Sequence, residues 1–182
     1  MTALDILELD AADESSFTTA VAPLFEGASG FLVRLAAARP FGTWPRLCVR
    51  ARVIAHAMPA PEQIELINAH PRLGAPPASM SALSFQEQGH DREASAAAAA
   101  EVAGESEIER QSIALELDRL NAAYEARFGF RYCVLVAGRS REALLPDIAA
   151  ALSAGRETEL HRALDAVVDI AIARLESLGA GR

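Results

Sequence analysis

Apolar side chains recur at intervals of three and four residues along most of this chain, and that spacing constrains its fold more than any other feature. Trp44, Leu47 and Ala51 follow the pattern, which places them on one face of an α-helix. The same spacing runs through 113–124 and again through 160–178. Shorter segments that fit a helix lie at 14–22, 31–38, 61–69 and 141–153. Proline-rich stretches such as "ARPFG" and "AMPAP" separate them, so the chain is predicted to be mainly α-helical.

One segment departs from helical spacing. Residues 130–138, "FRYCVLVAG", are β-branched and aromatic, which is typical of extended backbone. No second segment of similar strength is available to pair with it. We therefore expect an all-α, single-domain helical bundle over residues 1–182 with one isolated extended segment around 130–137. The alanine-rich stretch 93–107 is low in complexity but favours helix, with fraying expected near Gly104.

Composition narrows the classes of function. The formal charge of −8 disfavours nucleic acid and anionic membrane as partners, because binding phosphate needs clustered positive charge. Every basic residue is arginine, which excludes a Schiff-base lysine and a P-loop lysine. Cys48 and Cys133 are far apart in apolar surroundings and predict buried free thiols in a reducing compartment. The acidic N-terminus and the lack of an apolar run of about 20 residues favour a cytoplasmic protein.

The stretch "IELINAHPRLG", 64–74, contains the histidine with the strongest case for chemistry. A residue before proline avoids the α region, so a helix is expected to end at about Ala69, with His70 beside its last carbonyls. The partial negative charge of those carbonyls favours the imidazolium form, and we expect a rigidly held imidazole that titrates near neutral pH. The alternative is a histidine that only caps the helix through a hydrogen bond to a carbonyl.

Ser84 and Glu87, within "LSFQEQG", have the spacing of a capping box, in which the hydroxyl and the carboxylate each bind an amide at the start of a helix. Such a helix start would also be a rigid polar cradle for an anionic or urea-like group. Further along, the extended segment would offer backbone hydrogen bonds to a ligand rich in amides, while its aromatic side chains are expected to fill the core. No cluster with metal-ligand spacing occurs in the sequence, so we expect no metal.

Three motifs in this order, "AHPRLG", "SFQEQ" and "YEARFGFRYCVLVAGRSREALL", make the chain resemble the 2-oxo-4-hydroxy-4-carboxy-5-ureidoimidazoline (OHCU) decarboxylases. The stretches "LFEGASGFLVRLAAARPF" and "ETELHRALDAVVDIAIARLESL" also look like the first and last helices of that family. The resemblance runs from about Leu24 to Leu178. It implies an all-α, cofactor-free and usually dimeric enzyme of urate degradation. That enzyme would act after urate oxidase and hydroxyisourate hydrolase and convert its small-molecule substrate to (S)-allantoin.

The resemblance also implies roles for particular residues. The catalytic histidine of the family corresponds to His70, and a catalytic carboxylate corresponds to Glu87. The residues implied to contact substrate are Pro71, Ser84, Gln88, Tyr132, Cys133, Val134, Leu135 and Val136, the last five mostly through backbone groups. Decarboxylation would leave an electron pair that the substrate takes up as an enolate. His70 would then deliver a proton, with Glu87 favouring the charged imidazole.

Some positions depart from the pattern of the family. Arg72 stands where many members have Asp, Arg131 where Pro or Ile is common, and Ala137 where animal members have Arg. Two alternatives therefore stay open. One is a related decarboxylase or racemase that acts on another small ureido or oxo acid, and the other is a helical interaction protein without catalysis. Hydroxyisourate hydrolase is the expected functional partner, and neither nucleic acid nor membrane is expected.

Overall fold

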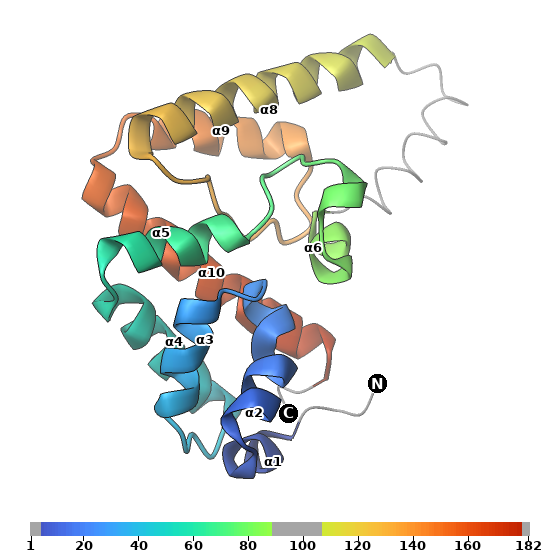
Figure 1. Ribbon diagram of the computed structural model, residues 1–182. Helices are drawn as coiled ribbons and strands as arrows, with labels where there is room; N and C mark the ends of the chain where they lie inside the picture. The colour runs from blue at the N-terminus through green and yellow to red at the C-terminus, as the bar shows by residue number, and fades with distance from the viewer. Residues whose placement is uncertain (1–4, 89–106, 180–182) are drawn as a thin grey trace. The chain divides into compact units, whose positions relative to one another are not determined.

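The computed structural model describes residues 5–88 and 107–179 of the chain. These residues form two compact units, one within Met1–His70 and Leu160–Arg182 and the other within Pro71–Glu159. The described part contains helices and connecting loops and no strand, which confirms the all-α prediction (Figure 1). The single domain expected over 1–182 stays a prediction. The helix expected over 93–107 falls, except for its last residue, outside the described residues.

Three helices of the first unit begin where a side chain binds an amide of the first turn. Asp5, Asp13 and Thr43 each stand just before a helix and accept a hydrogen bond from an amide of its first turn. The unit comprises α1 (Ile6–Ala11), α2 (Glu14–Val21), the 3-10 helix η1 (Ala22–Phe25), α3 (Ser29–Ala37), α4 (Trp44–Ala57), α5 (Ala60–Ala69) and most of α10 (Arg156–Ser177). The short helices predicted in this region agree with α2, α3 and α5 to within two residues at each end. Helix α1 was not predicted, because six residues are too few for a helical spacing to stand out.

The core of the first unit is made by one apolar face from each helix. The fully buried side chains include Phe17 from α2, Leu35 from α3, Leu47 from α4, Leu66 from α5 and Val167 from α10. Each such side chain contributes about 1.5–3 kcal/mol through its removal from water. The apolar spacing of the sequence therefore marks the buried faces correctly.

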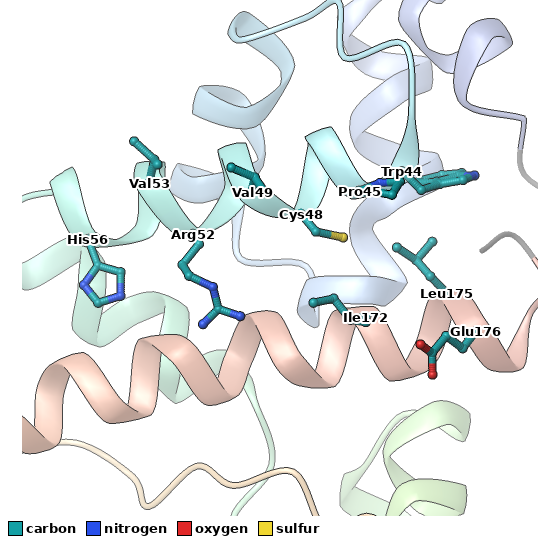
Figure 2. Close-up of a pocket in the computed structure, with 10 residues that line it drawn as sticks. All are labelled: Trp44, Pro45, Cys48, Val49, Arg52, Val53, His56, Ile172, Leu175 and Glu176. Atoms are coloured by element: carbon teal, nitrogen blue, oxygen red, sulfur yellow. The ribbon is translucent and has the colours of Figure 1, made fainter. Parts of the chain in front are cut away.

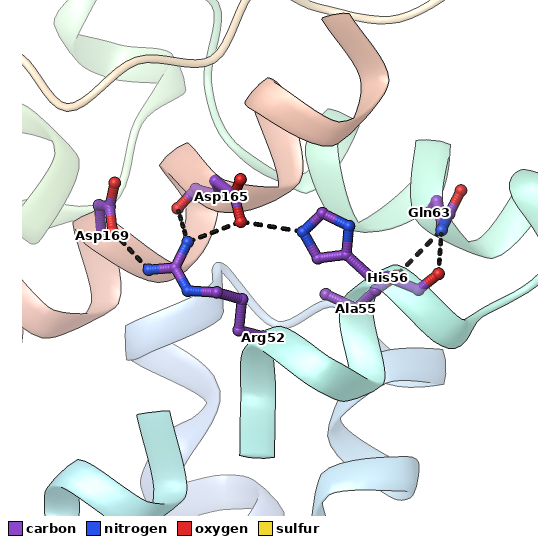
Figure 3. A network of polar contacts seen from close by, with 6 residues as sticks. All are labelled: Arg52, Ala55, His56, Gln63, Asp165 and Asp169. Atoms are coloured by element: carbon purple, nitrogen blue, oxygen red, sulfur yellow. Dashed lines mark hydrogen bonds and ion pairs between the residues drawn. The ribbon is translucent and has the colours of Figure 1, made fainter. Parts of the chain in front are cut away.

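A polar network also joins α4 to α10 (Figure 3). Arg52 donates to Asp165 and to Asp169 from its two terminal nitrogens, each at 2.6 Å. His56 Nε2 lies 2.9 Å from the same Asp165. The buried Gln63 donates to the carbonyls of Ala55 and His56, in the last turn of α4, at 3.1 and 3.0 Å. Partial burial alone would raise the pKa of Asp165, but the hydrogen bonds from His56 and Arg52 outweigh it and lower that pKa.

The second unit is built around α8 (Glu107–Phe128) and α9 (Arg141–Ala151), which pack against each other, with η2 (Pro77–Ser79) and α6 (Ala82–Glu87) completing it. Gly129 ends α8 with a φ of 80°, a left-handed conformation that favours glycine. Around this turn the ring of Tyr124 lies 4.5 Å from Phe128, 5.8 Å from Phe130 and 5.1 Å from Tyr132, measured between centroids. All four rings are buried, so the aromatic residues fill the core as predicted.

The segment expected to be extended, 130–137, is neither helical nor part of a ladder. The side chain of Arg139 folds back onto it and donates to the carbonyls of Leu135 at 2.9 Å and Val136 at 3.2 Å. Asp147 holds the same guanidinium at 2.7 Å. These hydrogen bonds satisfy carbonyls that a neighbouring strand would bind in a sheet.

Asp10, at the end of α1, holds the loop that leads into α4. Its carboxylate accepts hydrogen bonds from the amides of Phe41 at 2.9 Å and Gly42 at 2.7 Å. Arg39 supports the same corner by donating to the Leu9 carbonyl at 3.1 Å. A carboxylate that binds two amides makes charge-assisted hydrogen bonds, which are stronger than neutral ones. The helix that the sequence did not predict therefore fixes one end of the first unit.

Replacing Asp10 with alanine is expected to lower the free energy of unfolding by about 1–3 kcal/mol, because two amides lose a charged acceptor. Asp5→Ala is the control, since Asp5 caps α1 through an exposed hydrogen bond of 2.8 Å and should cost about 1 kcal/mol. Urea denaturation followed by circular dichroism measures both losses. A loss for Asp10→Ala no greater than that for Asp5→Ala would contradict the role given to Asp10.

Candidate functional site

His70 stands at the end of α5, as the sequence predicts. It is the C-cap residue, with φ −71° and ψ 140°, because Pro71 disfavours a helical conformation before it. Its amide donates to Ile67 O at 3.2 Å, and its ring Nδ1 lies 3.4 Å from Leu66 O. Since a carbonyl oxygen only accepts, Nδ1 carries a proton, and the lone pair of a neutral ring is then on Nε2. The side chain is 4% exposed, so α5 presents a buried imidazole of defined orientation.

The expectation that His70 titrates near neutral pH is wrong. Burial, together with the positive charge of Arg174, lowers the pKa of His70 to about 4. The negative charge of Glu26 and the hydrogen bond to Leu66 O act in the opposite direction and are outweighed. His70 is therefore neutral at pH 7, and the helix-end carbonyls do not hold it in the imidazolium form.

Arg174 and Glu26 form a buried ion pair that the sequence patterns did not reveal. Arg174 is 1% exposed and donates to Glu26 Oε1 at 2.7 Å and to the carbonyls of Pro23 and Leu24 at 2.6 and 3.3 Å. Glu26 follows η1 with a left-handed φ of 51°. A signal was present in the sequence, because Arg174 stands directly before Leu175 on the apolar stripe of the last helix. A charged residue on a buried stripe requires a buried partner.

The lowered pKa of His70 makes the stability of the fold depend on pH. The unfolded chain has the ordinary pKa of 6.5 at this residue, so between pH 6.5 and about 4 it binds a proton that the folded chain does not. Stability therefore falls as the pH falls through that window, by roughly 3 kcal/mol from His70.

His70→Gln is expected to lose that part of the decline, because glutamine does not titrate. His161→Gln, at an exposed position of α10, should decline as the original chain does. Urea denaturation at several pH values between 7 and 4.5 measures the three slopes. An undiminished slope in His70→Gln would contradict a buried, neutral His70.

In the second unit the loop 71–75 is tied to two helices. Gln88, which follows α6, accepts a hydrogen bond from the Gly74 amide at 2.9 Å and donates to Arg72 O at 3.3 Å. From α8, the side-chain amide of the buried Asn121 donates a hydrogen bond to Leu73 O at 3.0 Å. The amide of Gln88, expected to contact substrate, thus binds the loop at both its oxygen and its nitrogen. Asn121 was not predicted, since nothing in its local sequence marks a long-range contact.

Gly74 and Arg72, two residues of this loop, are constrained by their contacts with α8. Gly74 has a φ of 79°, and a Cβ added there would lie 2.6 Å from Leu117 Cδ2, so the position requires glycine. Arg72 pairs with Glu125 at 3.1 Å and with Asp118 at 3.5 Å, both from α8. The departure of Arg72 from the family pattern is therefore matched by acidic partners within the same unit.

Replacing Gln88 with alanine is expected to speed hydrogen exchange at the Gly74 amide at least about tenfold, because that amide loses its acceptor. Gln86→Ala is the matched control, an exposed glutamine of the same helix. Exchange measured by NMR at neutral pH compares the two variants. If the Gly74 amide exchanges equally in both, Gln88 does not hold the loop.

The capping box predicted at Ser84 and Glu87 is wrong. Ser81 is the N-cap of α6, with φ −66° and ψ 160°, and its Oγ accepts a hydrogen bond from the Ser84 amide at 3.2 Å. Ser84 is the third residue of the helix, and its side chain is buried. Ser81 and Ser84 lie three residues apart in the sequence. Because Ser81 caps the helix, Ser84 lies within the first turn with its side chain buried. Glu87 is half-buried at the last position of α6.

The residues predicted to form a site divide between the two units. His70 belongs to the first unit. The second unit holds Pro71, Ser84, Glu87, Gln88, Tyr132, Cys133, Val134, Leu135 and Val136. It brings Gln88 to the loop that begins at Pro71, whereas Arg139 already binds the carbonyls of Leu135 and Val136. The pairing of His70 with Glu87, and every role toward substrate, stays a prediction.

The remaining candidates for chemistry are metal-binding side chains and the two cysteine thiols. Within residues 5–88 and 107–179, no three His, Cys, Asp or Glu side chains are placed to hold a metal ion. Burial raises the pKa of the Cys48 thiol, with Arg52 acting weakly against it, so the thiol stays protonated. Cys133 is a buried free thiol. No helix of the described part is both long and apolar enough to cross a membrane.

The described residues thus form an all-α fold in which a buried, neutral imidazole lies within the electrostatic influence of an arginine–glutamate pair. The family model described as OHCU decarboxylase matches residues 10–176, and this chain belongs to that family.

Two relatives show how widely the similarity extends. Over 171 residues the chain is 32% identical to the uric acid degradation bifunctional protein PucL of Bacillus subtilis (strain 168), a match that covers 94% of this chain and 32% of PucL. Over 172 residues it is 27% identical to the 2-oxo-4-hydroxy-4-carboxy-5-ureidoimidazoline decarboxylase of Haloferax volcanii, which covers 94% of both chains. The chain thus spans about a third of the length of PucL and nearly the whole of the second relative.

Two solved structures share the fold. One is a crystal structure of (S)-allantoin synthase, with a TM-score of 0.63 and 17% identity, covering 96% of this chain and 54% of that one. The other is OHCU decarboxylase in the presence of (S)-allantoin, with a TM-score of 0.62 and 19% identity, covering 92% of this chain and 98% of that one. At these identities the likeness establishes the fold.

Proposed function

We propose that this chain decarboxylates 2-oxo-4-hydroxy-4-carboxy-5-ureidoimidazoline to (S)-allantoin, a step of urate degradation. Membership of the OHCU decarboxylase family supports the reaction. The relative of similar length from Haloferax volcanii is described as that decarboxylase, and PucL as a uric acid degradation protein. The observation that carries the proposal is His70, a buried and neutral imidazole held at the end of α5.

The reaction needs one proton removed and two protons added, and the net uptake of one proton balances the loss of the carboxylate. Cleavage of the bond between ring carbon 4 and its carboxylate releases carbon dioxide, and the bonding electrons stay in the ring. They are taken up by the carbon–nitrogen double bond at carbon 5, and the ring nitrogen gains a proton from water, which gives an enol of the product. The hydroxyl on carbon 4 then loses its proton to become a carbonyl, and carbon 5, which bears the ureido group, gains one. The face that receives this proton determines the enantiomer.

A neutral His70 suits the proton transfers at the hydroxyl and at carbon 5. Because Nδ1–H is directed to Leu66 O, Nε2 is the atom that accepts the hydroxyl proton. The imidazolium that forms is acidic in this buried position, since the pKa of His70 is about 4, and it returns the proton to carbon 5. In this scheme His70 is the proton donor expected from the sequence, after acting first as a base.

The other predicted residues are proposed to hold the substrate. Glu87 would bind the ureido N–H groups of the substrate. Backbone amides of 132–136 would receive the developing oxyanion, since an amide N–H is the backbone group that donates to an anionic oxygen. Pro71, Ser84 and Gln88 would line the site, with Gln88 acting chiefly on the loop 71–75.

We further propose a cofactor-free, cytoplasmic homodimer that receives its substrate from a hydroxyisourate hydrolase. The absence of a cofactor follows from the chemistry, since the ring of the substrate itself takes up the electrons. The hydrolase fits because the substrate carries a newly opened ureido group, which a hydrolytic step must supply. The sequence resemblance supports the homodimer.

His70→Ala is expected to lower kcat at least about 100-fold and to reduce the enantiomeric excess of the allantoin formed. The assay generates substrate freshly with urate oxidase and hydroxyisourate hydrolase and follows optical activity. His161→Ala, which removes an exposed histidine, should keep the original rate. Chiral product at the original rate from His70→Ala would contradict the proposal. No acceleration by the original chain over spontaneous decay would favour another ureido or oxo acid as substrate.

A further inference from the structure

The buried ion pair of the first unit has no role in the reaction as proposed above. Glu26 Oε1 and Arg174 Nη2 are 2.7 Å apart, and the two side chains are 11% and 1% exposed. Both belong to the same compact unit as His70. A buried ion pair often stabilises a fold no more than apolar side chains of similar size would. The pair is therefore a candidate for a role beyond stability.

The packing of α3 against α5 places Glu26 toward the C-terminal end of α5. Arg34, in the last turn of α3, donates to Glu62 in the first turn of α5 at 2.8 Å. Ser29, the first residue of α3, donates to Glu65, further along α5, at 3.4 Å. The two helices therefore run antiparallel. The segment before α3, to which Glu26 belongs, thus lies toward the end of α5 at which the candidate catalytic histidine stands.

Helix α10 brings Arg174 to the same segment. Ile172, Leu175 and Glu176 of this helix line an apolar groove against α4 (Figure 2). Arg174 instead reaches η1, where it donates to two carbonyls at 2.6 and 3.3 Å and to Glu26 at 2.7 Å. A guanidinium with its donors used in this way is held in one orientation. The carboxylate of Glu26 is therefore fixed in position by a buried positive partner.

Both charges of the pair act on the imidazole. Burial is the largest cause of the lowered pKa of His70, Arg174 acts in the same direction, and Glu26 acts against them. In the proposed reaction the ring must carry a proton briefly. Glu26 favours that charged state, as does the hydrogen bond to Leu66 O, whereas Arg174 prevents the carboxylate from holding the proton on the ring. The pair thus supplies two opposing effects that a base of intermediate strength requires.

We propose that Glu26 is a positioning residue of the reaction, whose carboxylate, held by Arg174, stabilises the imidazolium that His70 forms in each turnover. Glu26 acts through the ring and not on the substrate, and no proton passes to it. Arg174 limits this stabilisation, so the imidazolium can return its proton to carbon 5 of the substrate. The inference rests on the proposed function, but the effect of Glu26 on His70 can be measured without substrate.

Titration of the His70 ring tests the electrostatic effect. Glu26→Gln is expected to weaken proton binding by the ring at least about fivefold, because a negative charge that favours the imidazolium is lost. The double variant Glu26→Gln/Arg174→Met should bind the proton more tightly than the original chain, since the larger, opposing charge is also removed. NMR of labelled histidine rings between pH 7 and 3.5 measures the titration, with circular dichroism at each pH as a check of folding.

The direction of the change distinguishes this role from a structural one. A variant that only loosened the unit would admit water to the ring and raise its pKa toward the ordinary value of 6.5. Loss of the negative charge lowers it instead. Glu65→Gln is the matched control, since it makes the same change at an exposed carboxylate of the same unit and should titrate as the original chain does. A pKa of His70 that rises or does not change in Glu26→Gln would overturn the proposal.

Turnover tests whether the effect reaches the reaction, and it is measured at neutral pH on freshly generated substrate. Glu26→Gln is expected to lower kcat at least about tenfold and to change KM less than about threefold, because Glu26 acts on the ring. Glu26→Asp keeps the charge and should recover most of the rate, and Glu65→Gln should keep all of it.

The outcomes separate this inference from the proposed function. An original kcat in Glu26→Gln, or no recovery in Glu26→Asp, would overturn the role of Glu26 and leave the proposed reaction intact. An original chain that does not accelerate the decay of the substrate would overturn the proposed function and the role of Glu26 in turnover. In that case the titration still shows whether Glu26 acts on His70.

Discussion

The first unit depends on one buried ion pair, between Arg174 of the last helix and Glu26 after η1. The pair joins segments 148 residues apart and also satisfies the carbonyls of Pro23 and Leu24. Loss of either partner would leave an uncompensated charge in the interior, which typically costs about 3–5 kcal/mol. The same arginine disfavours a proton on His70. Burial is the main cause of the lowered pKa of His70, and of the two charges that hold the ends of the unit together Arg174 adds to that effect while Glu26 opposes it.

The neutral state of His70 follows from the sizes of two opposing effects. A helix C-terminus stabilises a cationic histidine by at most about 2 kcal/mol, and usually by less than 1 kcal/mol. The fall in pKa from 6.5 to about 4 corresponds to roughly 3 kcal/mol in the opposite direction, after the helix-end carbonyl has made its contribution. Desolvation and Arg174 therefore prevail. A proton taken up by such a ring is held weakly, and in the proposed reaction this would favour its return to the substrate.

The features correctly predicted from the sequence are those that depend on residues only a few positions apart. The helices around 44–54, 113–124 and 160–178, and the end of α5 at Ala69, were correct because apolar spacing and the constraint of proline act over a few residues. Prediction from the sequence failed at the cap of α6, where two serines three residues apart could each cap the helix. It also failed for the charge of His70, which depends on burial and on a residue distant in the sequence. The contact of Asn121 with the loop 71–75 was missed for the latter reason.

The second unit shows how a residue predicted to bind substrate can act mainly on its own chain. The side chain of Gln88 commits one lone pair of its oxygen to the Gly74 amide and one N–H to the Arg72 carbonyl, so its orientation is set by the loop and a ligand could use at most its second lone pair and second N–H. The loop that Gln88 holds begins with Pro71, and its hydrogen bonds at Arg72 and Gly74 fix the backbone within the second unit. Under the proposed reaction, Gln88 would therefore contribute more by keeping this loop in one conformation than by an additional hydrogen bond to the substrate.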